Sequence, residues 1–175
     1  PPYWCATSAD GFTWSLFHTF PEDAGILTCD GTLFVAAAGP NIYTSTNGNT
    51  WTNTSFLSYQ PYGIISGGSG KFLAFGGNKT STSADGVTWS TQTVSPTFIS
   101  KNGGMDNFEQ TSWVMTSNGS IYMGFDTGNK VWTSPDGITW TQKTTPLAPN
   151  TNFPPPSSNA PWYQPLITSN GSKFI

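Results

Sequence analysis

One eight-residue pattern, T-S-x-[DN]-G-x-T-W, occurs four times in this chain of 175 residues. The copies align without gaps and begin at Thr7, Thr44, Thr82 and Thr133. Their tryptophans are 37, 38 and 51 residues apart, a spacing typical of proteins in which each repeat is one blade of a β-propeller. Asp-Gly or Asn-Gly between two β-prone runs favours a hairpin turn, because both residues tolerate a positive φ. Each copy therefore predicts two antiparallel strands joined by a tight turn.

Two more strands are predicted upstream of each turn. Apolar runs that begin with glycine lie at 31–36, 70–75 and 119–124, and each is preceded by another short apolar run, at 25–28, 63–66 and 112–115. One repeat thus contains four short antiparallel strands, as a propeller blade does. We call them A, B, C and D in chain order, with the repeated turn between C and D.

The two ends of the sequence predict half a blade each. Residues 166–175 supply strands A and B, and the N-terminal segment through Trp14 supplies C and D. Joined in one sheet, they would complete a fourth blade and leave no open edge. We therefore predict an all-β propeller of four-stranded antiparallel blades, in one domain covering 1–175. The alternative is a stretch of a larger propeller. The predicted blades cover approximately 20–55, 59–95, 108–145, and 162–175 joined with 1–17.

Composition excludes several classes of function. Only 9% of residues are charged, the net charge is −3, and all six basic residues are lysines, so no basic face for nucleic acid is expected. No apolar run approaches the ~18 residues of a membrane span. Without an initiator Met or a signal-peptide pattern, the chain is expected to be processed or part of a longer protein. Cys5 and Cys29 can form a bridge or remain thiols, and His18 is the only histidine.

The repeated S-x-D-G-x-T-W resembles the Asp-box, or BNR repeat, of sialidase-like β-propellers, in a shortened form with no residue between Asp and Gly. Together with the G-x-F-L/V-A strands, it is similar to propellers found in bacteriophage virion proteins. The resemblance implies the fold and says little about activity. Sialidases bind the substrate carboxylate with three arginines, and this chain has none, so we do not expect sialidase activity.

The remaining acidic residues do not predict another enzyme. Hydrolysis of other glycosides needs two carboxylates facing each other across a cleft, and we interpret the acids outside the repeats as solubilising and turn residues: Glu22, Asp23, Asp30, Asp106, Glu109 and Asp126. Within the repeats, we expect the Asp or Asn to close its own turn and the tryptophan to lie in the core, rather than to bind metal or sugar. These structural residues are Asp10, Trp14, Asn47, Trp51, Asp85, Trp89, Asp136 and Trp140. No metal and no cofactor is expected.

The loops opposite the repeated turns are the candidate binding face. In a propeller the D-to-A and B-to-C connections share one face, and here they are rich in aromatic and amide side chains with few charges. Such a surface suits a neutral glycan or a protein surface. Alternatively, its aromatic side chains cap the core. The candidate binding residues are Tyr59, Tyr62, Asn78, Asn129, Phe153, Trp162 and Tyr163.

Together these features predict a non-catalytic binding or structural module. Its expected setting is a phage particle, as a tail, receptor-binding or capsid-decoration component, at the virion surface or otherwise extracellular. Its partners would be protein subunits of the assembly or neutral surface glycans, with no nucleic acid and no membrane. A stand-alone carbohydrate-binding lectin is the alternative, and a glycoside hydrolase the least favoured.

Overall fold

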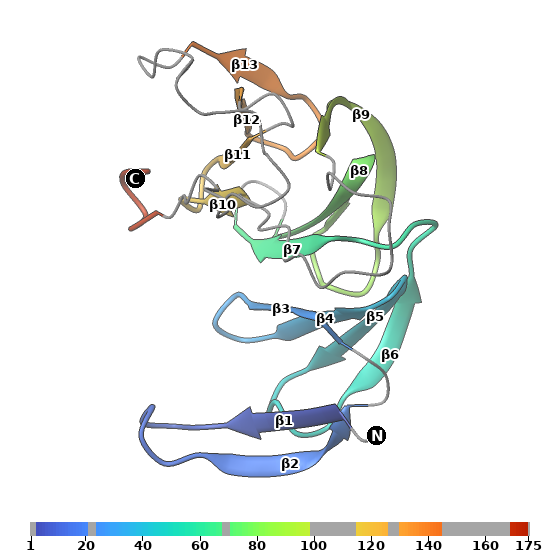
Figure 1. Cartoon of the computed structure of the whole chain (residues 1–175), viewed down its shortest axis with the longest axis vertical. Coiled ribbons are helices and arrows are strands. Elements are labelled where there is room, and N and C mark those ends of the chain that lie inside the picture. Colours follow the sequence, from blue (N-terminus) through green and yellow to red (C-terminus); the bar gives the residue numbers. More distant parts are fainter. Residues whose placement is uncertain are drawn as a thin grey trace, which may run out of the picture.

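In the part of the chain that the computed structural model describes, every element is a β-strand, and the strands form four successive antiparallel sheets (Figure 1). The structure describes residues 3–20, 24–67, 71–98, 115–125, 130–144 and 169–174. The first sheet pairs β1 (Tyr3–Thr7) with β2 (Ser15–Phe20). The second has the order β3 (Ile26–Cys29), β4 (Phe34–Ala38), β5 (Asn41–Ser45), β6 (Thr52–Phe56).

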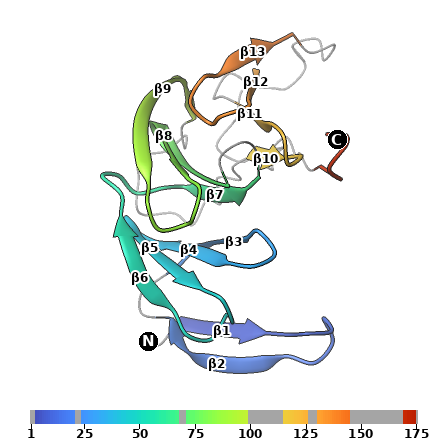
Figure 2. The ribbon, with the colours of Figure 1, turned by 180° about the vertical axis from the view of Figure 1, so that it is seen from behind.

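The third sheet contains β7 (Gly63–Ser66), β8 (Phe72–Ser83) and β9 (Ser90–Phe98). The fourth has the order β10 (Met115–Ser117), β11 (Tyr122–Phe125), β12 (Val131–Ser134), β13 (Thr141–Lys143). The second and fourth sheets thus have the four strands, A to D, that the sequence predicts for a blade. Figure 2, the view from behind, shows the same succession of sheets along the longest axis of the molecule, from β1–β2 at one end to β13 at the other.

The 12-residue strand β8 supplies both inner strands of its blade. Its first half pairs with β7 and its second half with β9. Leu73 and Thr82, nine positions apart, both reach the point where a Cβ on Gly137 would lie, whereas a straight strand would separate them by about 30 Å. The chain therefore folds back at Gly77, whose φ of 60° matches the 55° of Gly39 in the turn between β4 and β5.

The core lies between consecutive sheets. Along each strand, successive side chains point to opposite faces of the sheet. Those on one face contact the next blade, and those on the other face contact the previous blade. The interface between the second and third sheets buries Val35, Ala37, Ile42, Ile64, Phe72 and Ala74, with Trp89 packed against them. The interface between the third and fourth buries Leu73, Phe75, Val94, Met115, Tyr122 and Trp140. On the other face of the second sheet, Ala36, Ala38 and Tyr43 are buried, with Trp51 against them.

No sheet among the described residues joins the two ends of the chain. β1 and β2 form a two-stranded sheet, and Ser169–Phe174 is an isolated hairpin bridge. Residues 166–168 and Ile175, which belong to the predicted closing strands, lie outside the described residues. Closure of the ring and the number of blades stay predictions. Cys29 is a free thiol, so the structure contains no Cys5–Cys29 bridge.

Candidate functional site

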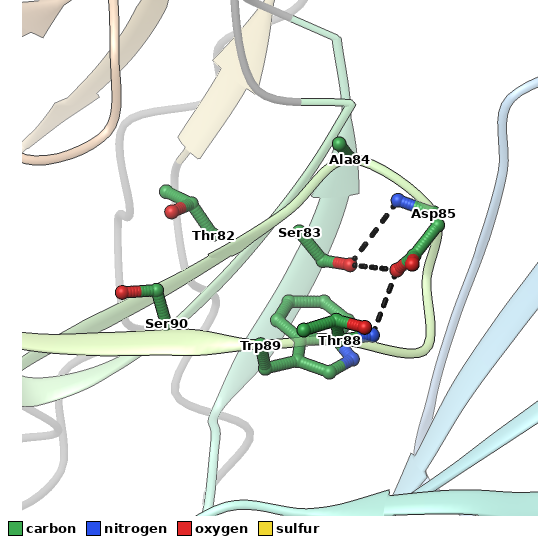
Figure 3. Close-up of a pocket in the computed structure, with 7 residues that line it drawn as sticks. All are labelled: Thr82, Ser83, Ala84, Asp85, Thr88, Trp89 and Ser90. Atoms are coloured by element: carbon green, nitrogen blue, oxygen red, sulfur yellow. Dashed lines mark hydrogen bonds between the residues drawn. The ribbon is translucent and has the colours of Figure 1, made fainter.

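The repeated motif is a hydrogen-bonded turn, shown for the third sheet in Figure 3. Ser83 Oγ donates to Asp85 Oδ1 (3.0 Å) and accepts from the backbone N–H of Gly86 (2.8 Å). Asp85 Oδ1 also accepts from the N–H groups of Val87 (2.8 Å) and Thr88 (2.7 Å). This one oxygen closes the turn between β8 and β9, which is why the motif needs an acceptor on a short side chain at that position.

The other three copies have the same hydrogen bonds. Asp10, Asn47 and Asp136 each accept from the N–H groups two and three positions ahead, at 2.7 to 2.9 Å. The N–H groups of Thr13 and Phe12 lower the pKa of Asp10 to about 2, and those of Thr88 and Val87 lower that of Asp85 to about 2. At Asp136 partial burial acts to raise the pKa, but the N–H groups of Thr139 and Ile138 outweigh it and the pKa is lowered.

The tryptophan of each motif donates its indole N–H to the carbonyl of the motif glycine, at 3.0 to 3.2 Å in all four copies. The prediction that all four lie in the core is wrong in part. Trp140 is buried, Trp51 and Trp89 are half-buried, and Trp14 is 61% exposed. The cause is position in the stack: Trp89 and Trp140 each pack against the sheet before their own, and no described sheet precedes the one that carries Trp14.

A shallow depression of about 310 Å³ lies beside the turn of the third sheet (Figure 3). Its only ionisable side chain is Asp85, whose Oδ1 is engaged by the turn. The other lining residues are Thr82, Ser83, Ala84, Thr88, Trp89 and Ser90. The carboxylate of Asp85, which accepts from the Ser83 hydroxyl, stays ionised down to about pH 2. It is therefore neither a general acid nor a base strong enough to activate that hydroxyl as a nucleophile.

Asp30, which sequence analysis assigned to turn chemistry, also joins two blades. Its Oδ1 accepts from the N–H groups of Thr32 (2.9 Å) and Leu33 (2.8 Å), and its Oδ2 forms an ion pair with Lys71 of the next blade at 2.7 Å. Lys71 and these N–H groups hold the pKa of Asp30 well below its usual range. Among the described residues, no three His, Cys, Asp or Glu side chains lie close enough together to hold a metal ion.

The structure brings three predicted binding residues together, in a group that we call the tyrosine platform: Tyr59, Tyr62, Gly76, Asn78 and Lys79. A Cβ on Gly76 would lie 3.2 Å from the Tyr59 ring, 3.1 Å from the Tyr62 ring and 2.8 Å from the carbonyl oxygen of Gln60. The D-to-A connection therefore packs directly on the end of the next blade, and only glycine fits there.

The two tyrosines of the platform have different roles. Tyr59 is half-buried, donates its hydroxyl to the Ala74 carbonyl at 3.1 Å, and has a pKa raised to about 12 by burial. The ammonium of Lys79 lies 5.8 Å from the centre of its ring. Tyr62 is anchored by its backbone N–H to the Phe75 carbonyl at 2.8 Å, while 39% of the residue stays exposed. Tyr59 thus caps the core, and Tyr62 and Asn78 present the outer surface.

The other predicted binding residues, Asn129, Phe153, Trp162 and Tyr163, lie outside the described residues. So do Glu22, Asp23, Asp106, Glu109 and Asp126. Sequence reasoning placed Lys79 on this face beside Asn78 but missed Gly76 as a member of the platform. The two consecutive glycines at 76 and 77, directly before Asn78, could have indicated this contact, since glycine in a strand often marks the close approach of another backbone.

No family model matches this sequence, and no curated protein matches it. Among solved structures, the chain is similar to one described as "YCF48 bound to D1 peptide", at 17% sequence identity and a TM-score of 0.51. The match covers 75% of this chain and 43% of that chain, so this chain spans less than half the length of its structural neighbour. The likeness concerns the fold alone. This chain has an all-β, β-propeller-like fold.

Proposed function

We propose that this chain is a non-catalytic binding module whose tyrosine platform contacts a protein subunit of a larger extracellular assembly such as a phage particle. The observation that carries the proposal is the platform itself. The partly exposed Tyr62 is held on the blade by the contact of its ring with Gly76 and by its backbone hydrogen bond to Phe75, and the exposed Asn78 follows Gly76 by two residues. A rigid aromatic group beside polar groups binds protein surfaces at low ordering cost.

Two further points support the proposal. The described aspartates, Asp10, Asp30, Asp85 and Asp136, all use their carboxylates to close turns. The structural neighbour is a propeller solved with a bound peptide. The phage setting rests on the resemblance of the four T-S-x-[DN]-G-x-T-W motifs to phage propellers.

The test compares two substitutions with similar exposure on different loops. Tyr62 is 39% exposed on the platform, and Val87 is 42% exposed at the tip of a repeated turn. Peptides selected against the purified chain from a random library should bind at least about ten-fold more weakly to Tyr62→Ala, a loss of about 1.4 kcal/mol. Val87→Ala should bind them as the parent does.

Failure would take one of two forms. Equal affinity of all three proteins for the selected peptides would remove the platform from the binding surface. Binding to neutral glycans on an array, lost in Tyr62→Ala and without any peptide binding, would favour the lectin alternative instead.

A further inference from the structure

Strand β1 differs from its counterparts in the other sheets. The C strand β5 lies between β4 and β6, and β12 lies between β11 and β13, so each is hydrogen-bonded on both sides. Among the described residues, β1 pairs only with β2. Within the part of the chain that the structure describes, the backbone N–H and C=O groups along one edge of β1 therefore have no ladder partner, and such an edge is a template for another strand.

The hairpin at 169–174 has the structure of an A-to-B turn. Asn170 Oδ1 accepts from the N–H groups of Ser172 (3.0 Å) and Lys173 (2.9 Å). Asn118 makes the same two bonds in the fourth sheet, at 3.0 and 2.9 Å. The following glycines, Gly171 and Gly119, both have a φ of 89°. In the fourth sheet the strand after this turn pairs with a C strand, whereas the described part of the hairpin pairs only with itself.

The register of the missing pairing follows from the complete blades. The fourth residue after the turn Asp or Asn faces the motif serine: Phe34 faces Ser45, and Tyr122 faces Ser134. By the same count Phe174 would face Ser8, and Ile175 would face Thr7. The hairpin and β1 are thus matching halves of one blade.

The structure keeps these halves apart. Figures 1 and 2 place the hairpin on the side of β10 and β1 at the far end of the longest axis, beyond the second sheet. The turn between β1 and β2 also has no neighbouring sheet among the described residues. A Cβ on Gly48, Gly86 or Gly137 would touch the preceding sheet, but no described atom lies within 4 Å of that position on Gly11.

We propose that the hairpin 169–174 of one copy of this chain pairs with β1 of a second copy. The fourth sheet of the incoming copy then lies before the β1–β2 sheet and covers Gly11 and Trp14. The two surfaces are different and complementary, so the contact is head-to-tail and leads to a ring of copies or to an open array.

Cysteine cross-linking tests this pairing in two separate chains. One chain carries Thr7→Cys and the other Ile175→Cys, both with Cys5→Ser and Cys29→Ser. Mixed and oxidised with oxidised glutathione, they should form a dimer linked between positions 7 and 175. Ala6→Cys replaces Thr7→Cys as the matched control. Its side chain points to the opposite face of the strand, so it should give about ten-fold less of this product.

Native mass spectrometry of the unsubstituted chain should show multiples of the monomer mass at rising concentration.

Two results would overturn the proposal. A chain carrying both Thr7→Cys and Ile175→Cys that links only within itself would show that the hairpin closes on its own β1. A mass that stays monomeric over about 1 to 100 μM, without any 7–175 link in the mixture, would show that the edge takes no strand from a copy of this chain.

Discussion

At the residue scale, the four repeated turns show what their chemistry requires. Asn47 makes with its amide oxygen the same two bonds, at 2.8 and 2.9 Å, that Asp85 makes with its carboxylate at 2.8 and 2.7 Å. The turn therefore needs an acceptor oxygen on the residue that lies two and three positions before the two N–H groups. A negative charge on that oxygen only strengthens the bonds. This local requirement is the reason that the turns could be located from the sequence alone.

Replacing Asp85 by Asn should reduce the pH dependence of folding. The pKa of Asp85 is lowered from 3.8 to about 2, so its ionised form adds stability that is complete above pH 4 and is lost as the pH falls through about 2. Asp85→Asn keeps the bonds without a titrating group. Urea unfolding at pH 5 and pH 2 should show a smaller drop in the free energy of unfolding for the variant than for the parent. An equal drop in both proteins would mean that Asp85 titrates normally.

At the element scale, each repeated turn is also a contact between blades. A Cβ on Gly137 would lie 2.7 Å from Leu73 Cδ1 and 3.0 Å from Thr82 Cγ2, and one on Gly86 would lie 2.8 Å from Leu33 Cδ2. The motif glycine thus has two functions, a positive φ in its own turn and close approach to the preceding sheet. The sequence predicted the first function. The second depends on residues 53 to 64 positions away and could not be seen in a local pattern.

The glycines at positions 137 and 11 separate these two functions. Their φ angles are 74° and 76°, so substitution by alanine strains both turns by a similar amount, roughly 1 kcal/mol. Only Gly137→Ala also forces a methyl group into the adjacent sheet, which should add about 1–3 kcal/mol. Chemical denaturation of the two variants, at a concentration where the chain is monomeric, measures the difference. Equal losses would show that the sheets move apart to accommodate the methyl group at no cost.

At the scale of the whole molecule, the strand order within blades was predicted from the sequence, whereas the closure of the ring stays a prediction. The pairing of β3 to β6 follows from turns such as Asp30-Gly31 and Asn47-Gly48, which join neighbouring strands. Closure would need residues 166–175 to meet β1 across the whole chain, and no turn residue specifies such a contact. The same limit applies to the platform. Tyr59, Tyr62 and Asn78 lie within 20 residues of one another and were assigned to one face, whereas the packing of the two rings on Gly76 needed the structure.

Stability should therefore vary along the stack of sheets. The third sheet is packed on both faces, against Val35 and Ile42 of the second sheet and against Met115 and Tyr122 of the fourth. Within the described residues the first sheet is a two-stranded hairpin, which has marginal stability by itself, and it exposes Trp14. In an array of repeats each unit is stabilised by its neighbours, so units at the ends open first.

Native-state hydrogen exchange should reproduce this order, with the slowest amide exchange in β8 and β4 and the fastest in β1 and β2. The amides of β4 and β8 are hydrogen-bonded in sheets whose side chains at Val35, Ala36, Phe72 and Leu73 are at most 1% exposed, so their exchange requires separation of whole sheets. Amides of β1 need only the opening of one hairpin. The measurement is made on the dilute monomer by mass spectrometry of peptic peptides. If the peptides of β1 exchange as slowly as those of β8, the first sheet is covered even in the monomer, and the molecule unfolds as one unit rather than from its end.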